Sequence, residues 1–266
     1  MNAAERKMLD ILTRLKEVYG ALAVKAEFEA EGSRTDELVM LNEVVFRAGM
    51  NLFIKIGGCE AVRDLDQCRL LGASGIMAPM IETPFAMRKF MNAGRKVYAD
   101  QAEDIEWIIN TETITCHQNL EQILTEGTGF LNTIAIGRVD YSASLGLERD
   151  GINSDTVLER SIDMARRARE HGCRVGIGGG ISIDAIPFLQ KVCPYIDKFE
   201  TRKIVFPASA DKDLLRNEII YAMEFETLYL RNKCEYYDRM AKEDLSRINM
   251  MEARLRKAGN CGGDLQ

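Results

Sequence analysis

Residues 104–113, DIEWIINTET, predict a β-strand that is buried along its length and ends in a carboxylate. The apolar residues at 107–109 favour a strand, and Glu112 follows Asn110 on the same face because strand side chains alternate with a period of two. Such a carboxylate is either solvated where the strand stops or part of the mouth of a site. This stretch alone favours a solvated Glu112, so the choice between the two interpretations depends on the rest of the chain.

Predicted strands and helices alternate on both sides of this segment. The strands are predicted at residues 21–28, 51–58, 75–79, 104–113, 132–140, 173–180 and 197–206. Helices are predicted at residues 2–19, 34–49, 60–72, 83–94, 119–127, 155–172 and 182–192. This alternation, with many short connections, indicates parallel strands joined by helical crossovers.

Eight such units close into a (β/α)8 barrel at about this chain length. Seven strands are clear, and residues 96–100, KVYAD, form either an eighth strand or a loop. An open doubly wound sheet is the alternative, but no Gly-x-Gly-x-x-Gly motif follows the first strand. We therefore predict an α/β fold, a (β/α)8 TIM barrel over residues 1–210 with a long C-terminal helical extension.

The extension covers residues 211–266 and is predicted as one long helix or two. Its first part carries apolar residues at helical spacing, and its later part is highly charged. Such a tail packs on its own barrel or on another subunit, so we expect it to mediate assembly into a homo-oligomer. The final residues, GNCGGDLQ (259–266), are expected to be mobile.

The composition limits the classes of partner and compartment. The formal net charge of -6 at pH 7 argues against nucleic acid and anionic membranes as partners but leaves an anionic substrate open. No apolar run approaches the roughly 18 residues of a membrane span, and the N-terminus MNAAERKMLDIL lacks the apolar core of a signal peptide. The 7 cysteines contain no Cys-x-x-Cys pair, which indicates reduced thiols in a cytoplasmic protein.

Polar residues gather at the carboxyl ends of the predicted strands, where active sites of parallel barrels lie. They are Lys25, Glu27, Glu29, Lys55, Glu82, Asn110, Glu112, Arg138, Asp140, Glu200, Arg202 and Lys203, joined by the glycines at 178–180. One charge at a strand end is commonplace, but the whole set predicts a site at this rim. The glycines either hold an anion with their backbone amides or form a tight turn that needs positive φ.

Glu112 and Asp140 end consecutive strands, which would lie about 4.8 Å apart in the barrel. Two carboxylates this close repel each other unless a cation sits between them. Two oxygen ligands with water in the remaining positions is a common way to hold Mg²⁺ or Mn²⁺. We therefore predict a divalent metal on Glu112 and Asp140. The alternative is that one of them pairs with Arg138 or Lys55.

On these motifs the chain resembles the HpcH/HpaI aldolase and citrate-lyase family of the pyruvate/phosphoenolpyruvate barrel superfamily. NTETITCHQNLEQIL resembles the family's metal-ligand strand and following helix, with Glu112 at the ligand position. AIGRVDYSASLG resembles its second ligand motif, Ile-Gly-x-x-Asp-Leu-Ser-x-Ser-Leu-Gly, with Asp140 as the ligand. LGASGIMAPMIETPFAM resembles the strand before them, and the resemblance runs from about residue 21 to 206.

The resemblance implies a metal that holds the carboxylate and ketone oxygens of pyruvate or a related 2-oxo acid. This polarises the carbonyl and stabilises an enolate, and the family makes or cleaves the carbon–carbon bond beside that carbonyl. We expect Asn110, Arg138 and Arg202 to bind this small-molecule substrate. For Arg202 an ion pair with Glu200 is the equal alternative.

Two departures from the family pattern concern proton chemistry. The resemblance implies an Arg on the strand where this chain has Lys55, and a His on the preceding strand, where none stands here. Lysine can donate to an enolate oxygen as a point charge but not as a two-pronged fork. We assign Lys55 to the enolate oxygen and Glu27 to acid–base chemistry, with Glu29 and Lys25 as substitutes.

The alternatives remain open at this stage. Lys55 could form a Schiff base with a ketone without any metal, or could simply pair with Glu27 or Glu82. The predicted activity is that of a metal-dependent aldolase acting through a pyruvate enolate. The second-ranked prediction is a lyase that cleaves 2-hydroxy-acyl thioesters, as citrate lyase does. A third possibility is not an enzyme but a relative of the family that binds its ligand without catalysis.

Overall fold

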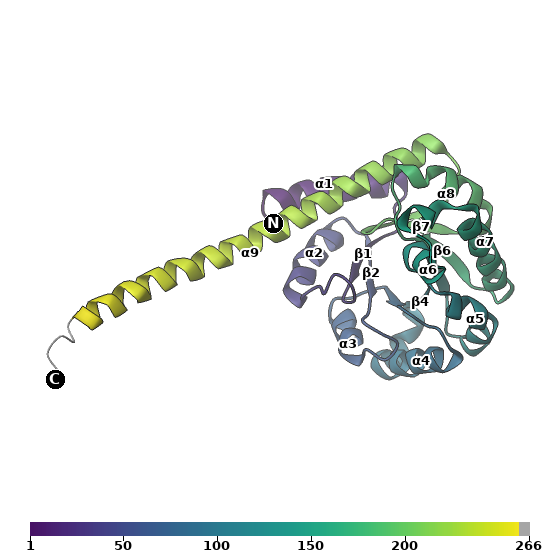
Figure 1. Cartoon of the computed structure of the whole chain (residues 1–266), viewed down its shortest axis with the longest axis horizontal. Coiled ribbons are helices and arrows are strands. Elements are labelled where there is room, and N and C mark those ends of the chain that lie inside the picture. Colours follow the sequence, from purple (N-terminus) through teal and green to yellow (C-terminus); the bar gives the residue numbers. More distant parts are fainter. Residues whose placement is uncertain (261–266) are drawn as a thin grey trace.

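The computed structural model describes residues 1–260, so most of the tail at 259–266 that was predicted to be mobile lies outside the described residues. Within this range eight strands form a closed barrel surrounded by helices (Figure 1). They are β1 (Ala23–Glu27), β2 (Asn51–Lys55), β3 (Gly75–Ala78), β4 (Glu106–Thr111), β5 (Thr133–Gly137), β6 (Arg174–Gly178), β7 (Lys198–Glu200) and β8 (Ile204–Pro207). The predicted TIM-barrel class is confirmed.

The last strand differs from the prediction. β1 to β7 pair as parallel neighbours, whereas β8 runs antiparallel to both β7 and β1. Residues 197–206, predicted as one strand, reverse direction because the Thr201 amide donates to the Ile204 carbonyl at 2.9 Å and the Ile204 amide donates to the Thr201 hydroxyl at 3.1 Å. The barrel therefore closes without an eighth parallel β/α unit, and residues 96–100 are not a strand.

The helices follow the predicted order with one addition. They are α1 (Ala3–Tyr19), α2 (Thr35–Arg47), α3 (Val62–Leu70), α4 (Pro84–Tyr98), α5 (Ile114–Glu126), α6 (Arg138–Ser144), α7 (Asp155–Glu170), α8 (Ile186–Val192) and α9 (Lys212–Asn260), with short 3-10 helices η1 (Ala99–Asp104), η2 (Arg149–Asn153), η3 (Ile183–Ala185) and η4 (Cys193–Tyr195). Thr83, Thr113 and Ser154 cap α4, α5 and α7 by accepting a hydrogen bond from a backbone amide three residues on. The addition is α6, which begins where the predicted strand 132–140 was still expected to continue. No helix within residues 1–260 has both the length and the apolar character that a membrane crossing requires.

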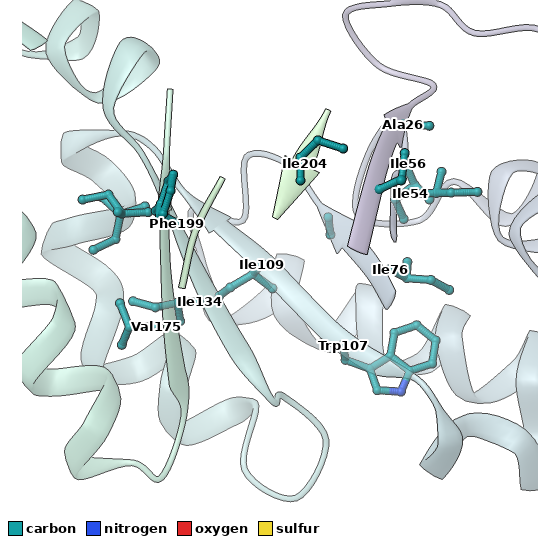
Figure 2. Packing of buried hydrophobic residues seen from close by; sticks show 14 of the residues in the cluster. Ala26, Ile54, Ile56, Ile76, Trp107, Ile109, Ile134, Val175, Phe199 and Ile204 are labelled. Atoms are coloured by element: carbon teal, nitrogen blue, oxygen red, sulfur yellow. The ribbon is translucent and has the colours of Figure 1, made fainter. Parts of the chain in front are cut away.

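Two apolar layers hold the barrel together. One fills the space between strands and helices, and its strand residues include Ile54, Ile76, Ile109, Ile134 and Val175 (Figure 2). The other is a small cluster formed by Ala23, Phe53, Met77, Ile108, Ala135 and Val205, which alternate with the first set along the strands. This alternation places the second cluster inside the barrel, below the rim that carries the polar residues.

Helix α9 is one continuous helix, and its first part belongs to the barrel. Leu215, Ile219, Ala222, Phe225 and Tyr229 are buried in the main core, with α1 lying alongside. Because β8 runs away from the rim that carries the polar residues, α9 begins at the opposite end of the barrel and passes this rim further along its length. It then continues well beyond the barrel (Figure 1).

Candidate active site

A cavity of about 560 Å³ opens at the carboxyl ends of the strands. Its charged lining comprises the carboxylates Glu27, Glu29, Glu112, Asp140, Glu200 and Glu226 and the cations Lys25, Lys55, Arg149 and Arg202. The rim predicted from the sequence is therefore a concave site, and its acidic side chains outnumber its basic ones by two.

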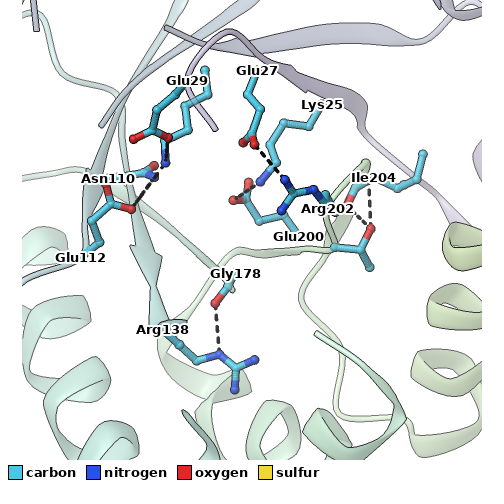
Figure 3. Close-up of polar contacts among 12 residues, drawn as sticks. Lys25, Glu27, Glu29, Asn110, Glu112, Arg138, Gly178, Glu200, Arg202 and Ile204 are labelled. Atoms are coloured by element: carbon cyan, nitrogen blue, oxygen red, sulfur yellow. Dashed lines mark hydrogen bonds and ion pairs between the residues drawn. The ribbon is translucent and has the colours of Figure 1, made fainter. Parts of the chain in front are cut away.

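Glu29 and Glu112 lie together at one side of the cavity (Figure 3), and Lys55 joins these two carboxylates. Its ammonium lies 2.6 Å from Oε2 of Glu29 and 3.6 Å from Oε2 of Glu112. Burial alone would lower the pKa of Lys55, but the charges of Glu112 and Glu29 outweigh it and raise the pKa above the ordinary value. Lys55 is thus a protonated hydrogen-bond donor, and the pairing with Glu27 or Glu82 considered from the sequence is replaced by Glu29 and Glu112.

Glu112 is almost fully buried, with 1% of its surface exposed. Its Oε1 accepts from the Met80 amide at 3.1 Å, and its Oε2 accepts from the Asn110 side chain at 2.9 Å. Burial raises the pKa of this carboxyl despite Lys55 and these hydrogen bonds. Gly137 makes room for it, because a Cβ there would lie 2.9 Å from both Cβ and Oε2 of Glu112.

Asp140 lies in the first turn of α6, is exposed, and lines the same cavity as Glu112. Next to Glu112, Oδ1 of Asn110 is buried and has no hydrogen-bond partner among the described residues. Carboxylate and amide oxygens are the ligand types that Mg²⁺ and Mn²⁺ favour. Within residues 1–260 no cluster of three or more His, Cys, Asp or Glu side chains is arranged to bind a metal. The donor set that fits a hard divalent cation is thus two carboxylates and one amide oxygen, with water required to complete it.

Glu27 at the end of β1 and Arg202 in the β7–β8 turn form an ion pair at the cavity wall. Arg202 Nη2 lies 3.2 Å from Oε1 of Glu27, and its Nε lies 3.1 Å from Oε1 of Glu31. Glu200, the partner considered for Arg202, instead pairs with Lys25 at 2.7 Å. Arg202 nevertheless keeps 52% of its side chain exposed, so its guanidinium is accessible from the cavity.

Arg138 does not line the cavity. Its buried guanidinium donates to the carbonyls of Gly178 at 3.1 Å and Gly179 at 2.7 Å, and to the side chain of Asn153 at 2.7 Å. It also stacks over the Phe188 ring at 4.5 Å. Burial without a carboxylate partner lowers its pKa to about 10. This placement gives Arg138 a role in holding the loop after β6 rather than in contacting substrate.

The glycine loop after β6 is a tight turn pressed against α6. Gly179 and Gly180 have φ of +79° and +64°, a region that favours glycine. A Cβ on Gly179 would lie 2.8 Å from the Val139 amide nitrogen. The positive φ that the tight-turn interpretation required is present, and the close packing fixes the loop beside the helix that carries Asp140.

Sequence reasoning missed two charged residues of the cavity lining, Arg149 and Glu226. Arg149 lies on η2, and Glu226 comes from α9, outside the strand ends that were searched. Neither makes an ion pair with another described residue, unlike Lys25, Lys55 and Arg202. Burial raises the pKa of the Glu226 carboxyl against the opposing charges of Lys203 and Arg202.

The two histidines lie away from the cavity. His117 bonds to Tyr141 and Asp163 at 2.7 Å each, and His171 bonds to Glu121 at 2.8 Å. Neither lines the cavity, so a side chain that acts as an acid or base there would be a carboxylate or a lysine.

Comparison with known families identifies one that matches more than half of the chain. The model of the HpcH/HpaI aldolase/citrate lyase family matches residues 33–179. The chain belongs to this family. The matched range contains Lys55, Glu112 and Asp140 but excludes β1 and α9, which supply Glu27 and Glu226.

Solved structures show the same fold at low sequence identity. An HpcH/HpaI aldolase from Desulfitobacterium hafniense DCB-2 has a TM-score of 0.60 at 16% identity, covering 73% of this chain and 82% of its own. An HpcH/HpaI aldolase/citrate lyase family protein from Burkholderia cenocepacia J2315 has a TM-score of 0.57 at 16% identity, covering 85% and 100%. RipC from Yersinia pestis reaches 0.51 at 13% identity, covering 77% and 87%. A search of curated protein sequences finds no match.

Proposed function

We propose that this chain is a divalent-metal-dependent carbon–carbon lyase that acts on a 2-oxo acid through its enolate. The observation that supports this most directly is the excess of carboxylates over cations in the cavity. A net negative cavity repels an anionic substrate, whereas a divalent cation would offset the surplus and attract a carboxylate. Glu112 and Asp140 would hold this ion, with the Asn110 oxygen beside them. When bound, Mg²⁺ or Mn²⁺ would supply Lewis-acid chemistry to the 2-oxo acid.

Lys55 would stabilise the enolate oxygen as a charged donor. Its raised pKa keeps it an ammonium, which suits hydrogen bonding to developing negative charge. A Schiff base needs the neutral amine, so the same shift disfavours that mechanism. Lys55 therefore takes the position of the family's Arg as a point charge.

The acid–base group can be Glu27, as expected from the sequence, or Glu226. Glu27 is held by Arg202, while Glu226 is half-buried and without an ion pair among the described residues. A carboxyl with a raised pKa accepts and returns a proton near neutral pH more readily. We therefore favour Glu226 and keep Glu27 as the alternative.

One carboxylate is sufficient for the proton transfers of the proposed cleavage. This carboxylate removes the proton of the substrate hydroxyl on the carbon that leaves as the aldehyde. The hydroxyl oxygen then forms the new carbonyl as the carbon–carbon bond breaks. The bonding pair moves into the 2-oxo acid and gives the enolate, whose oxygen Lys55 contacts. The protonated carboxyl then returns the proton to the enolate carbon. Arg202 and Arg149, at the cavity wall, would bind the anionic end of the substrate.

The test is exchange of the methyl protons of pyruvate in D₂O, followed by NMR with Mg²⁺ or Mn²⁺ and after chelation. Metal-dependent exchange that is lost in Glu112→Gln supports the proposal. Glu106→Gln is the matched control, because Glu106 starts the same strand at the opposite end of the barrel. Exchange that survives chelation contradicts metal dependence.

A second candidate, a relative that binds without turnover, is favoured by the absence of a cavity histidine and by Lys55 in place of the Arg. It predicts metal and pyruvate binding by calorimetry without any proton exchange.

A further inference from the structure

The last part of α9 has no contact with the barrel. The final polar contacts are Lys233 Nζ with Glu37 at 3.0 Å, Tyr237 with Glu37, and Tyr236 with Asp36 at 3.2 Å, all at the start of α2. Beyond them, every residue from 238 to 259 is exposed except Ala253, which is half-buried. We call residues 238–259 the distal segment; at 1.5 Å per residue it is about 33 Å long.

Most of the stability of a protein helix comes from packing of an apolar face, and no described residue outside α9 packs on the distal segment. Within the distal segment, ion pairs join Lys242 to Asp238 at 2.5 Å, Arg239 to Glu243 at 4.0 Å and Arg256 to Glu252 at 3.7 Å. Such exposed pairs contribute little to helix stability. A partner that packs on the segment would therefore add most of its stability.

An apolar stripe shows which face that partner would cover. Leu245, Ile248, Met251 and Leu255 recur at spacings of three, three and four, which places them on one side of a helix. Their exposed fractions are 56%, 51%, 46% and 67%. Met250, also 45% exposed, lies on the opposite side.

The charges on and just before the distal segment divide along its length. Residues 235–244 carry four acidic side chains, Glu235, Asp238, Glu243 and Asp244, against Arg239 and Lys242. Residues 247–257 carry four basic side chains, Arg247, Arg254, Arg256 and Lys257, against Glu252. In an antiparallel pair, the acidic half of each copy would lie beside the basic half of the other. In a parallel pair, halves of the same charge would lie side by side.

We propose that the distal segment of α9 pairs antiparallel with the same segment of a second copy of this chain, burying the stripe around Ile248. A twofold axis brings the same patch of both copies together, as self-complementary interfaces require. The divided charge favours a second copy over an anionic membrane, which would select a uniformly basic face. This proposal does not depend on the proposed lyase activity.

The test is sedimentation velocity of the full chain over a range of concentrations. We expect a wild-type dimer whose dissociation constant rises at least about tenfold in Ile248→Asp, because a buried unpaired charge replaces an apolar contact. Met250→Asp is the matched control and should leave the dimer intact. A wild-type monomer, or an assembly that Ile248→Asp leaves unchanged, overturns the proposal, as does a monomer that floats with phosphatidylserine vesicles.

Charge reversal tests the antiparallel orientation. Arg254→Glu with Lys257→Glu, and separately Glu235→Lys with Asp238→Lys, should each weaken the dimer by roughly tenfold. Combining all four substitutions should restore the wild-type dissociation constant within about threefold. Failure of the combined variant to recover, with both double variants weakened, contradicts the antiparallel arrangement.

Discussion

The ammonium of Lys55 lies 3.6 Å from Oε2 of Glu112, and both side chains are buried at the wall of the cavity. A second carboxylate, Glu29, lies 2.6 Å from the same nitrogen. Lys55 is therefore the cation between two acids on this side of the site, and its loss would leave both without their counter-charge.

Lys55→Met should lower the rate of proton exchange by roughly 100-fold or more, the range seen when a donor to a developing oxyanion is removed. Lys55→Arg keeps the charge and should retain part of the activity. NMR exchange rates measure both variants. Reduction of the wild-type protein with borohydride in the presence of pyruvate should leave Lys55 unmodified by mass spectrometry. A covalent adduct on Lys55 would establish the Schiff-base mechanism instead.

Asp140→Asn should weaken Mn²⁺ binding by roughly 100-fold or more, because losing a direct ligand should cost at least as much as losing an outer-shell partner, which costs about 10–100-fold. The substitution removes one of two carboxylates while leaving α6 intact, because Asp140 is exposed and makes no ion pair with a described residue. Electron paramagnetic resonance of free Mn²⁺ measures the affinity without needing turnover. Asp184→Asn, on η3 and outside the cavity lining, is the control. Equal affinity of both variants would exclude Asp140 as a ligand.

Glu226→Gln should remove the acidic limb of the pH–rate profile, because burial raises the pKa of Glu226 and no ion pair with a described residue holds its carboxylate. The rate should fall by about 100-fold or more, within the range for a positioned acid–base group. In Glu27→Gln the acidic limb should remain. The reverse outcome, with the limb lost only in Glu27→Gln, would return the role to the residue predicted from the sequence. Profiles of kcat/KM against pH for both variants decide between them.

The sequence predicted the barrel because hydrophobic runs and helical segments alternate at regular intervals. It missed the reversal at 201–203, because strand-forming residues stand on both sides of a turn whose closure depends on the Thr201 side chain. It also missed α6, since seven residues are too few to show helical periodicity. Both features depend on hydrogen bonds that the pattern of apolar and polar residues does not indicate.

Within the site, Glu112, Asp140 and Lys55 could be predicted because strand order alone brings their segments to one rim. Glu226 could not, since only the packing of α9 on the barrel brings it there. Its one sequence signal is its place directly after Phe225, at the edge of the buried stripe of α9. Arg138 was predicted to bind substrate because it stands at the end of a predicted strand, yet its guanidinium donates to backbone carbonyls of the loop after β6.

Arg138→Met should destabilise the protein by about 3 kcal/mol or more, because the carbonyls of Gly178 and Gly179 and the Asn153 side chain would lose their buried donor. Arg149→Met, exposed on the neighbouring 3-10 helix, should change stability by no more than about 0.5 kcal/mol. Urea unfolding of both variants measures the difference. Equal stability would show that the loop does not depend on the guanidinium.

Glu218, on the buried part of α9, should make stability depend on pH. It is 1% exposed, its Oε2 has no hydrogen-bond partner among the described residues, and burial, with Asp211 nearby, raises its pKa from 4.5 to about 7. Since the folded state holds the proton more tightly than the unfolded state, ionisation costs nothing below pH 4.5 and costs most above pH 7. Glu218→Gln should therefore match the wild type in acid and exceed its free energy of unfolding by up to about 3 kcal/mol at pH 8. Urea unfolding at pH 4.5 and pH 8 measures both ends, with the exposed Glu224→Gln on the same helix as a control. A gain of equal size at both pH values would show that packing, rather than the ionisation of Glu218, sets the effect.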